Sequence, residues 1–204
     1  MFWHKQSLKP VKTMAIKNRR LIVFNNSTLD GYFTSINGDS SWAHKNNEDA
    51  EWNQFVADNA NGAAILLVGR ITYELMANYW LSEQAMNNNF ALAERMKNMP
   101  KMVFSKTLDA VFWNNTKLVK GNLATEVRKI KKEGGDDMVI LGSGSLVAQL
   151  AQVGLIDEFR VVINPAMLGN GRTMFDGIKE KLSLELIKTK AFANGNVLLC
   201  YKPA

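Results

Sequence analysis

The stretch Met138-Val-Ile-Leu-Gly-Ser-Gly-Ser-Leu-Val-Ala-Gln-Leu-Ala-Gln152 combines a short apolar strand, a Gly-Ser-Gly-Ser turn and the beginning of an amphipathic helix. Gly142 and Gly144 would let a ligand approach the backbone, and the start of the helix would offer unpaired N–H groups to an anion. Alternatively, both glycines only allow the helix to pack tightly against its strand. The apolar residues of the helix recur at the spacing of one buried face: Leu146, Val147, Leu150 and Val153.

Length and composition favour a single α/β domain. The chain has 204 residues, enough for a substantial core, with ordinary apolar and charged fractions. It has no apolar stretch near the roughly 20 residues that a membrane-spanning helix needs, and no secretory signal at its start. Cys200 is the single cysteine and lies in an apolar strand pattern, so we expect a buried thiol and a cytoplasmic location.

The excess of positive charge comes from the amino-terminal segment. The net charge is +6, but six basic residues precede the first acid, Asp30, and residues 21–204 carry equal numbers of bases and acids. We therefore expect residues 1–18 to form a flexible basic extension and residues 19–204 to form the domain, with Met14 an alternative natural start. A nucleic-acid arm is the competing interpretation of this segment.

Alternating strand and helix patterns predict a mixed sheet of about eight strands. Most strands should be parallel, because helices separate them, and Asn194-Gly195 predicts a closing antiparallel hairpin. The expected strands are 19–27, 63–68, 101–105, 116–120, 138–141, 158–166, 182–190 and 196–202. The expected helices include 48–60, one starting at 69–74, 88–99, 123–133 and the one that follows Gly142.

Two strand–glycine–helix junctions, at Gly69 and at Gly142, are the main candidates for ligand binding. In a parallel sheet both would lie beyond the carboxyl ends of strands, where open α/β sheets bind ligands. Arg70 and Thr72 at one junction, and the Gly-Ser-Gly-Ser backbone at the other, would hold separate phosphates. Lys106 would add a cationic contact, so the pattern favours a dinucleotide with an extra phosphate, NADPH.

Other familiar sites are not supported. The Gly-Ser-Gly-Ser segment lacks the third glycine of the Rossmann fingerprint, and the chain has no P-loop and no nucleophile elbow around Ser143. His4, His44 and Cys200 are too few for a structural zinc site.

The polar segment after the first strand holds three candidate substrate residues. Asp30 would position substrate or relay a proton, Trp42 would stack on a flat heterocycle, and His44 would supply a proton. Each of the three could equally have a structural role.

Six segments, taken in order, resemble the dihydrofolate reductase-like superfamily, and specifically the reductase domain of the riboflavin pathway's bifunctional deaminase-reductase. They are Ser27-Thr-Leu-Asp-Gly31, Gly69-Arg-Ile-Thr-Tyr-Glu74, Val103-Phe-Ser-Lys-Thr-Leu108, Leu141-Gly-Ser-Gly-Ser-Leu146, Leu155-Ile-Asp-Glu158 and Pro165-Ala-Met-Leu-Gly-Asn-Gly171. The resemblance covers about residues 19–202. It implies a dihydrofolate reductase-like mixed sheet with helices on both faces, NADPH as hydride donor and a homodimer.

The resemblance also implies roles for particular residues. Those implied to hold the adenosine-phosphate end of NADPH are Gly69, Arg70, Thr72, Ser105 and Lys106, and those implied for the pyrophosphate and nicotinamide end are Gly142, Ser143, Gly144, Ser145 and Leu146. Asp30 and Trp42 would face the substrate. The chain has Ala77-Asn-Tyr-Trp80 where the riboflavin-pathway reductases have an acidic Asp-Asp-Pro segment. We therefore expect an NADPH-dependent reductase of a small flat heterocycle, pterin- or aminopyrimidine-like; the alternative is a catalytically silent NADP(H)-binding or sensor protein.

Overall fold

The structure, a computed structural model, describes residues 18–43, 49–62 and 65–204. Within these ranges eight strands form one sheet in the order β4-β3-β2-β5-β1-β6-β8-β7. The strands are β1 (Leu21–Thr28), β2 (Ile65–Gly69), β3 (Lys101–Phe104), β4 (Thr116–Val119), β5 (Met138–Leu141), β6 (Glu158–Asn164), β7 (Leu184–Ala191) and β8 (Val197–Pro203). β1 to β6 pair in parallel, and β8 pairs antiparallel with both β6 and β7. The mixed sheet and its closing hairpin are therefore confirmed.

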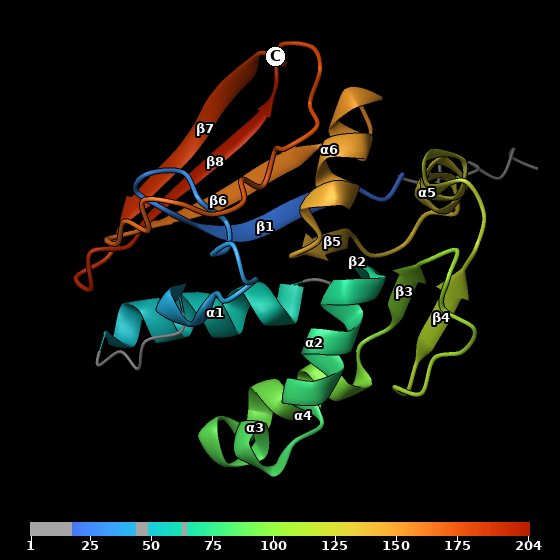
Figure 1. Ribbon diagram of the computed structural model, residues 1–204, viewed down its shortest axis with the longest axis horizontal. Coiled ribbons are helices and arrows are strands. Elements are labelled where there is room, and N and C mark those ends of the chain that lie inside the picture. The colour runs from blue at the N-terminus through green and yellow to red at the C-terminus, as the bar shows by residue number, and fades with distance from the viewer. Residues whose placement is uncertain (1–17, 44–48, 63–64) are drawn as a thin grey trace, which may run out of the picture.

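Helices cover both faces of the sheet, as expected (Figure 1). They are α1 (Ala50–Gly62), α2 (Arg70–Trp80), α3 (Glu83–Asn88), α4 (Phe90–Asn98), α5 (Leu123–Lys132) and α6 (Gly144–Gln152), with a short 3-10 helix η1 (Ser41–Ala43). On one face α5 and α6 pack on Leu21, Val23 and Ile140, and on the other face α2 and α4 pack on Val68 and Val103. The buried side chains of β2, β3 and β5 alternate between the two faces, so both helical layers share these strands.

The structure corrects several predicted details. The helix predicted at 88–99 is two helices, because Asn89 adopts an extended conformation and caps α4 through its side chain. Val153 is 43% exposed rather than buried, since it follows the last turn of α6 with non-helical backbone angles. β6 ends at Asn164 because Pro165 cannot donate to a ladder. Cys200 is buried, as expected.

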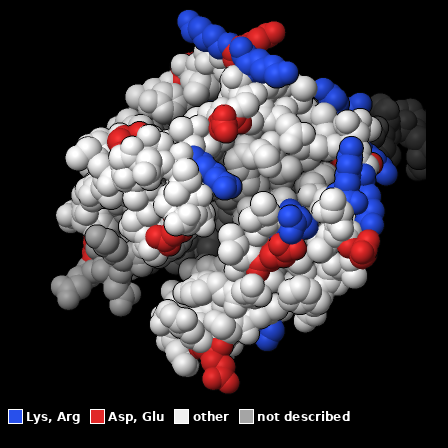
Figure 2. Space-filling view, viewed as in Figure 1, with Lys and Arg blue, Asp and Glu red and all other residues white. Residues whose placement is uncertain are grey.

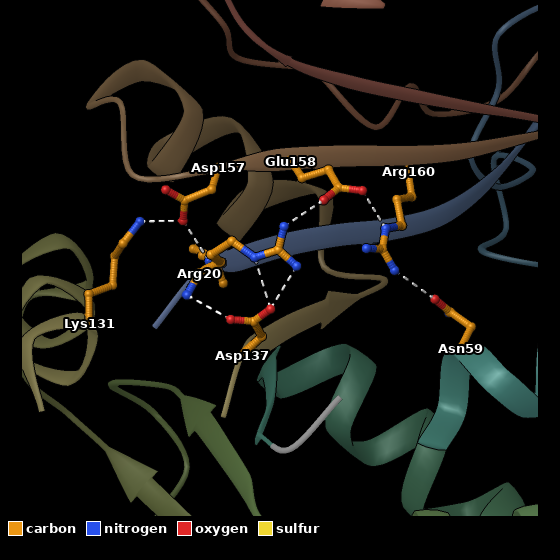
Figure 3. Close-up of polar contacts among 8 residues, drawn as sticks. Arg20, Asn59, Lys131, Asp137, Asp157, Glu158 and Arg160 are labelled. Atoms are coloured by element: carbon orange, nitrogen blue, oxygen red, sulfur yellow. Dashed lines mark hydrogen bonds and ion pairs between the residues drawn. The ribbon is translucent and has the colours of Figure 1, made fainter. Parts of the chain in front are cut away.

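The amino ends of β1, β5 and β6 are joined by a network of ion pairs (Figure 3). Arg20 binds Asp137 at 2.8 Å and Glu158 at 3.2 Å. Glu158 also accepts from Arg160 at 2.6 Å, and Arg160 donates to Asn59 of α1 at 3.2 Å. Arg20, Asp137, Glu158, Arg160 and Asn59 are called the amino-edge network below. It fixes three neighbouring strands and a helix at one end of the sheet.

Two features are absent from the described residues. None of the helices is both long and apolar enough to span a bilayer. No group of three or more His, Cys, Asp or Glu side chains is arranged to hold a metal ion. Figure 2 shows acidic and basic side chains interspersed on one face, with basic residues near the edge that α5 occupies. The basic extension and His44 lie outside the described residues.

Candidate functional site

The two glycine junctions meet at the carboxyl edge of the sheet. β2 pairs with β5, so the β2–α2 corner at Gly69 lies beside the β5–α6 corner at Gly142. The Ser143 hydroxyl donates to Thr72 Oγ1 at 2.8 Å and accepts from the Gly69 N–H at 2.8 Å. Thr72 Oγ1 also accepts from the Ser143 N–H at 3.1 Å. These hydrogen bonds hold the two corners together, and the joined corners are called the rim below.

The glycines of the second corner are needed for packing within the protein. Gly142 has φ +69°, and a Cβ there would lie 2.8 Å from Thr72 Cγ2. A Cβ at Gly144 would lie 3.1 Å from the Met174 carbonyl oxygen. Both positions therefore fit the packing interpretation of these glycines, and neither needs a ligand to explain it.

The start of α6 nevertheless keeps free donors. Ser143 caps the helix in the left-handed conformation, with φ +57° and ψ +57°, and its carbonyl accepts from Leu146 and Val147. In the described part of the chain the N–H groups of Gly144 and Ser145 have no acceptor. Ser145 is exposed and Leu146 is buried in the core. Two backbone donors at a helix start make this corner suited to an anion.

β1 supports the rim from the adjacent position. Asn25, 4% exposed, accepts from the Gly142 N–H through Oδ1 at 2.6 Å. Its Nδ2 contacts Met174 Sδ at 3.1 Å. The order of the strands reverses between β5 and β1, and such a switch point is where open α/β sheets bind ligands. Asn25 therefore holds the second corner at that point.

The cationic residues expected at the phosphates lie at the same edge. Arg70 opens α2, and its guanidinium pairs with Glu74 at 3.0 Å while 44% of the side chain stays exposed. Lys106 follows the end of β3, is exposed and makes no ion pair within the described residues. The Ser105 hydroxyl accepts from the N–H groups of Thr107 and Leu108, so it shapes the turn that carries Lys106.

Asp30 is exposed, and its carboxylate is hydrogen-bonded within the protein. Its carboxylate accepts from the Thr28 hydroxyl at 2.5 Å and from the N–H groups of Leu168 and Gly169 at 3.0 and 2.8 Å. These hydrogen bonds, the Thr28 bond first, hold the pKa of Asp30 below its usual range. The two bonds to Leu168 and Gly169 make Asp30 an anchor of the 165–171 loop, and its expected role in positioning substrate or relaying a proton stays a prediction.

Trp42 lies in η1, half-buried, at the end of the segment that follows β1. Its indole Nε1 is buried and has no hydrogen-bond partner among the described residues. A buried indole N–H normally has an acceptor, so this atom is one to which a bound molecule could supply the acceptor. The stacking role expected for Trp42 remains a prediction.

A hollow beside Ser145 adds residues that the sequence analysis missed. It has a volume of about 580 Å³ and lies between the start of α5, the outer face of α6 and the 176–179 loop. Asn122, Ala148, Gln149 and Lys179 line it together with Ser145. Asn122 caps α5 just after β4, so the β4–α5 connection is a third strand–helix junction at the carboxyl edge. Gly121, which precedes Asn122, is the sequence signal from which this junction could have been predicted.

These features fit the two ends of a dinucleotide. Free backbone donors lie at the β5–α6 corner, exposed cations follow β2 and β3, and a hollow adjoins Ser145.

Comparison with known proteins agrees on the fold. The Bacillus subtilis (strain 168) protein YyaP, whose function is uncharacterised, is 30% identical over 189 residues, which is 93% of this chain and 97% of YyaP.

Two solved structures show the same fold. A Shewanella sp. PV-4 protein that is described as a riboflavin biosynthesis protein superposes with a TM-score of 0.69 at 22% sequence identity. The superposition covers 91% of this chain and 99% of the Shewanella chain. Dihydrofolate reductase from Enterococcus faecalis, solved with NADP(H), has a TM-score of 0.60 at 13% identity, covering 90% and 96%. The model of the RibD C-terminal domain matches residues 19–198. This chain therefore belongs to the RibD C-terminal domain family.

Proposed function

We propose that the protein is an NADPH-dependent reductase of a small, flat heterocycle, with the cofactor bound along the carboxyl edge of the sheet. The observation that carries the proposal is the direct linkage of the two corners through Ser143 and Thr72, beside the free N–H groups of Gly144 and Ser145. The family and the fold of the dihydrofolate reductase solved with NADP(H) support it.

In this proposal each part of the rim has a separate task. Gly144 and Ser145 would donate to the pyrophosphate, and Arg70 and Lys106 would pair with the phosphate that distinguishes NADPH from NADH. NADPH would supply the hydride when bound. The protein would gain rate mainly by holding the reacting carbons close together and by excluding water.

Cofactor binding tests the proposal most directly. We expect NADPH to bind with a dissociation constant in the micromolar range or below, measured by quenching of tryptophan fluorescence. Lys106→Ala should weaken NADPH binding about tenfold, because a charge-assisted contact is lost, and should leave NADH binding unchanged. Lys132→Ala on α5, also an exposed lysine, is the matched control. Equal losses for both cofactors would contradict the assigned phosphate contact.

A catalytically silent NADP(H)-binding protein is the second candidate. It is favoured by one observation: the Asp30 carboxylate, the acid expected to relay a proton, is bonded to the 165–171 loop. Turnover of NADPH with pterins, pyrimidines or quinones, followed at 340 nm, would exclude this candidate. Tight binding without any oxidation would support it.

We also propose that the protein forms a homodimer. β7 is an edge strand, and three of its apolar side chains are exposed: Leu184, Leu186 and Ile187, at 39%, 49% and 46%. Exposed apolar groups on an edge strand favour pairing with a second chain. Light scattering of the wild type and of Leu186→Glu tests this, and a monomeric wild type would contradict it.

A further inference from the structure

The β5–α6 corner is held by a side chain that takes over where two strands stop pairing. Pairing of β1 with β5 ends at Phe24 and Leu141, so Asn25 and Gly142 are the next positions on the two strands. The Asn25 carboxamide accepts from the Gly142 N–H at 2.6 Å and donates to the Gly142 carbonyl at 3.5 Å. Both polar backbone groups of Gly142 therefore depend on the orientation of one carboxamide.

The orientation of that carboxamide is fixed by its two neighbours. The Gly142 N–H can only donate, so the atom of Asn25 that faces it must be the oxygen Oδ1. The amide nitrogen Nδ2 is then the atom that meets Met174 Sδ, at 3.1 Å. A thioether sulfur can only accept, so a flipped carboxamide would place an oxygen against it. Asn25 and Met174 are 4% and 3% exposed, and their contact is shielded from water.

Met174 also contacts the corner through its backbone. A Cβ at Gly144 would lie 3.1 Å from the Met174 carbonyl oxygen and 3.6 Å from its Cα, so the two main chains pack directly. Arg172, two residues earlier, pairs with Thr34: its N–H donates to the Thr34 carbonyl at 2.9 Å, and the Thr34 N–H donates back at 3.3 Å. Met174 also belongs to the core cluster that contains Leu146 of α6. Its sulfur is therefore held in place from two sides.

The corner needs such support because two successive residues lie in the left-handed region. Gly142 has φ +69° and Ser143 has φ +57°. A non-glycine residue in this region costs free energy and persists only where its surroundings fix it. The N–H groups of Gly144 and Ser145, which have no acceptor among the described residues, come next in the chain. Rotation of the Asn25 carboxamide would release the Gly142 N–H and change the direction of these donors.

We infer that Met174 is a positioning residue for the cofactor, because its sulfur fixes the Asn25 carboxamide that holds the β5–α6 corner. Through that corner it aligns the N–H groups of Gly144 and Ser145. The inference rests on the proposed function, in which these two groups donate to the pyrophosphate of NADPH. The pyrophosphate then meets donors that are already aligned, and binding does not have to supply the free energy of ordering them.

Two substitutions separate this role from simple packing. Met174→Leu keeps an apolar side chain of similar volume but has no acceptor, whereas Met174→Gln offers a carbonyl oxygen to Asn25 Nδ2 and fits an apolar core less well. We expect Met174→Leu to weaken NADPH binding about fivefold, the size of one lost hydrogen bond, and Met174→Gln to stay closer to the wild type. Urea unfolding should rank the two variants in the opposite order. Weaker NADPH binding by Met174→Gln than by Met174→Leu would contradict the inference.

A matched control and a shorter ligand show where the contribution falls. Met167→Leu makes the same change at a 74% exposed methionine of the β6–β7 connection and should bind NADPH as the wild type does. Adenosine 2′-phosphate carries the phosphate that we assign to Arg70 and Lys106 but has no pyrophosphate. Calorimetry should give it equal affinities for the wild type and Met174→Leu. Equal losses for NADPH and this shorter ligand would mean that Met174 only supports the fold.

¹⁵N spectra test the corner without the cofactor, with inorganic pyrophosphate as the probe. Pyrophosphate should shift the backbone amide signals of Gly144 and Ser145 in the wild type, and Met174→Leu should need about fivefold more of it. Met174→Leu should also shift the side-chain amide signal of Asn25 before any ligand is added. An unchanged Asn25 signal, or an unchanged pyrophosphate titration, would overturn the inference.

The same titration distinguishes failure of the inference from failure of the proposed function. A wild type that binds pyrophosphate at this corner but does not bind NADPH would refute the proposed function, and the comparison with Met174→Leu would still decide the role of Met174. A wild type whose Gly144 and Ser145 signals do not respond to pyrophosphate would refute both.

Discussion

The two ends of the parallel strands differ in how their polar groups are used. At the amino edge, charged side chains satisfy one another, as in the bonds from Arg20 to Asp137 and Glu158 (Figure 3). At the carboxyl edge, beside charged groups such as Arg70 and Lys106, hydroxyls, amides and backbone N–H groups gather, and the N–H groups of Gly144 and Ser145 have no acceptor among the described residues. Since we propose that the carboxyl edge binds the cofactor, substitutions at the two edges should separate stability from ligand binding.

Removing Glu158 should have the largest effect on stability. Its carboxylate, with 10% of the side chain exposed, accepts from both Arg20 and Arg160, so Glu158→Ala removes one partner from each guanidinium and leaves Arg20 with Asp137 and Arg160 with Asn59. We expect a loss of about 3 kcal/mol in the free energy of unfolding, measured with urea. The remaining folded protein should bind NADPH as the wild type does. If the variant binds NADPH more weakly than the wild type under conditions in which essentially all of it is folded, the two edges are coupled.

Gly142→Ala should affect the carboxyl edge in both respects. A Cβ would lie 2.8 Å from Thr72 Cγ2 at a residue with φ +69°, so the two corners must move apart. We expect a loss of about 2 kcal/mol in stability and at least a tenfold loss of NADPH affinity. Gly154→Ala, at φ +64° with open space around the Cβ, is the control for backbone strain alone. Equal effects of both variants on affinity would exclude corner separation as the cause.

Lys101 should make stability depend on pH at the amino edge. It is 1% exposed, donates to the Met99 and Lys97 carbonyls at 2.7 and 3.1 Å, and burial lowers its pKa to about 8. The unfolded chain, with the ordinary value of 10.5, binds more protons above pH 8 than the folded protein does. Stability should therefore rise as the pH increases from about 8 to 10.5. Urea unfolding of Lys101→Met across this range should lack that rise.

Asp30 should give a smaller effect, in acid. Its folded pKa lies below the ordinary value, so its contribution is present above that value and is lost as the pH falls through the folded pKa. Asp30→Asn should lower the urea midpoint at pH 7, and the difference from the wild type should shrink below pH 4. A constant difference across this range would mean that the ionised form is not what holds the 165–171 loop.

Much of the fold could be predicted because it depends on local patterns. The alternation of buried strands and helices, and Asn194-Gly195 at the final turn, predicted the mixed sheet with its antiparallel hairpin. Element ends were less predictable. Val153 fits the helical spacing of α6, but the helix ends one residue earlier, so its exposure depends on the tertiary path of the chain.

The site could be predicted only in part. Gly69 and Gly142 could be recognised as junctions, but the hydroxyl bridge between Thr72 and Ser143 joins residues 71 positions apart. The bond from Asn25 to Met174 spans 149 positions. Separations of this size carry no local signal, because neither residue influences the conformation around the other until the sheet has formed.

The sequence by itself determined where strands end and helices begin, because glycines and helical spacing act within a few residues. It also determined where the excess of positive charge lies, which is before residue 21. Only the tertiary structure decided that β2 lies next to β5 and that β5 lies next to β1. Strand order follows from how both helical layers share the core, and this long-range packing brings the corners of the candidate site together.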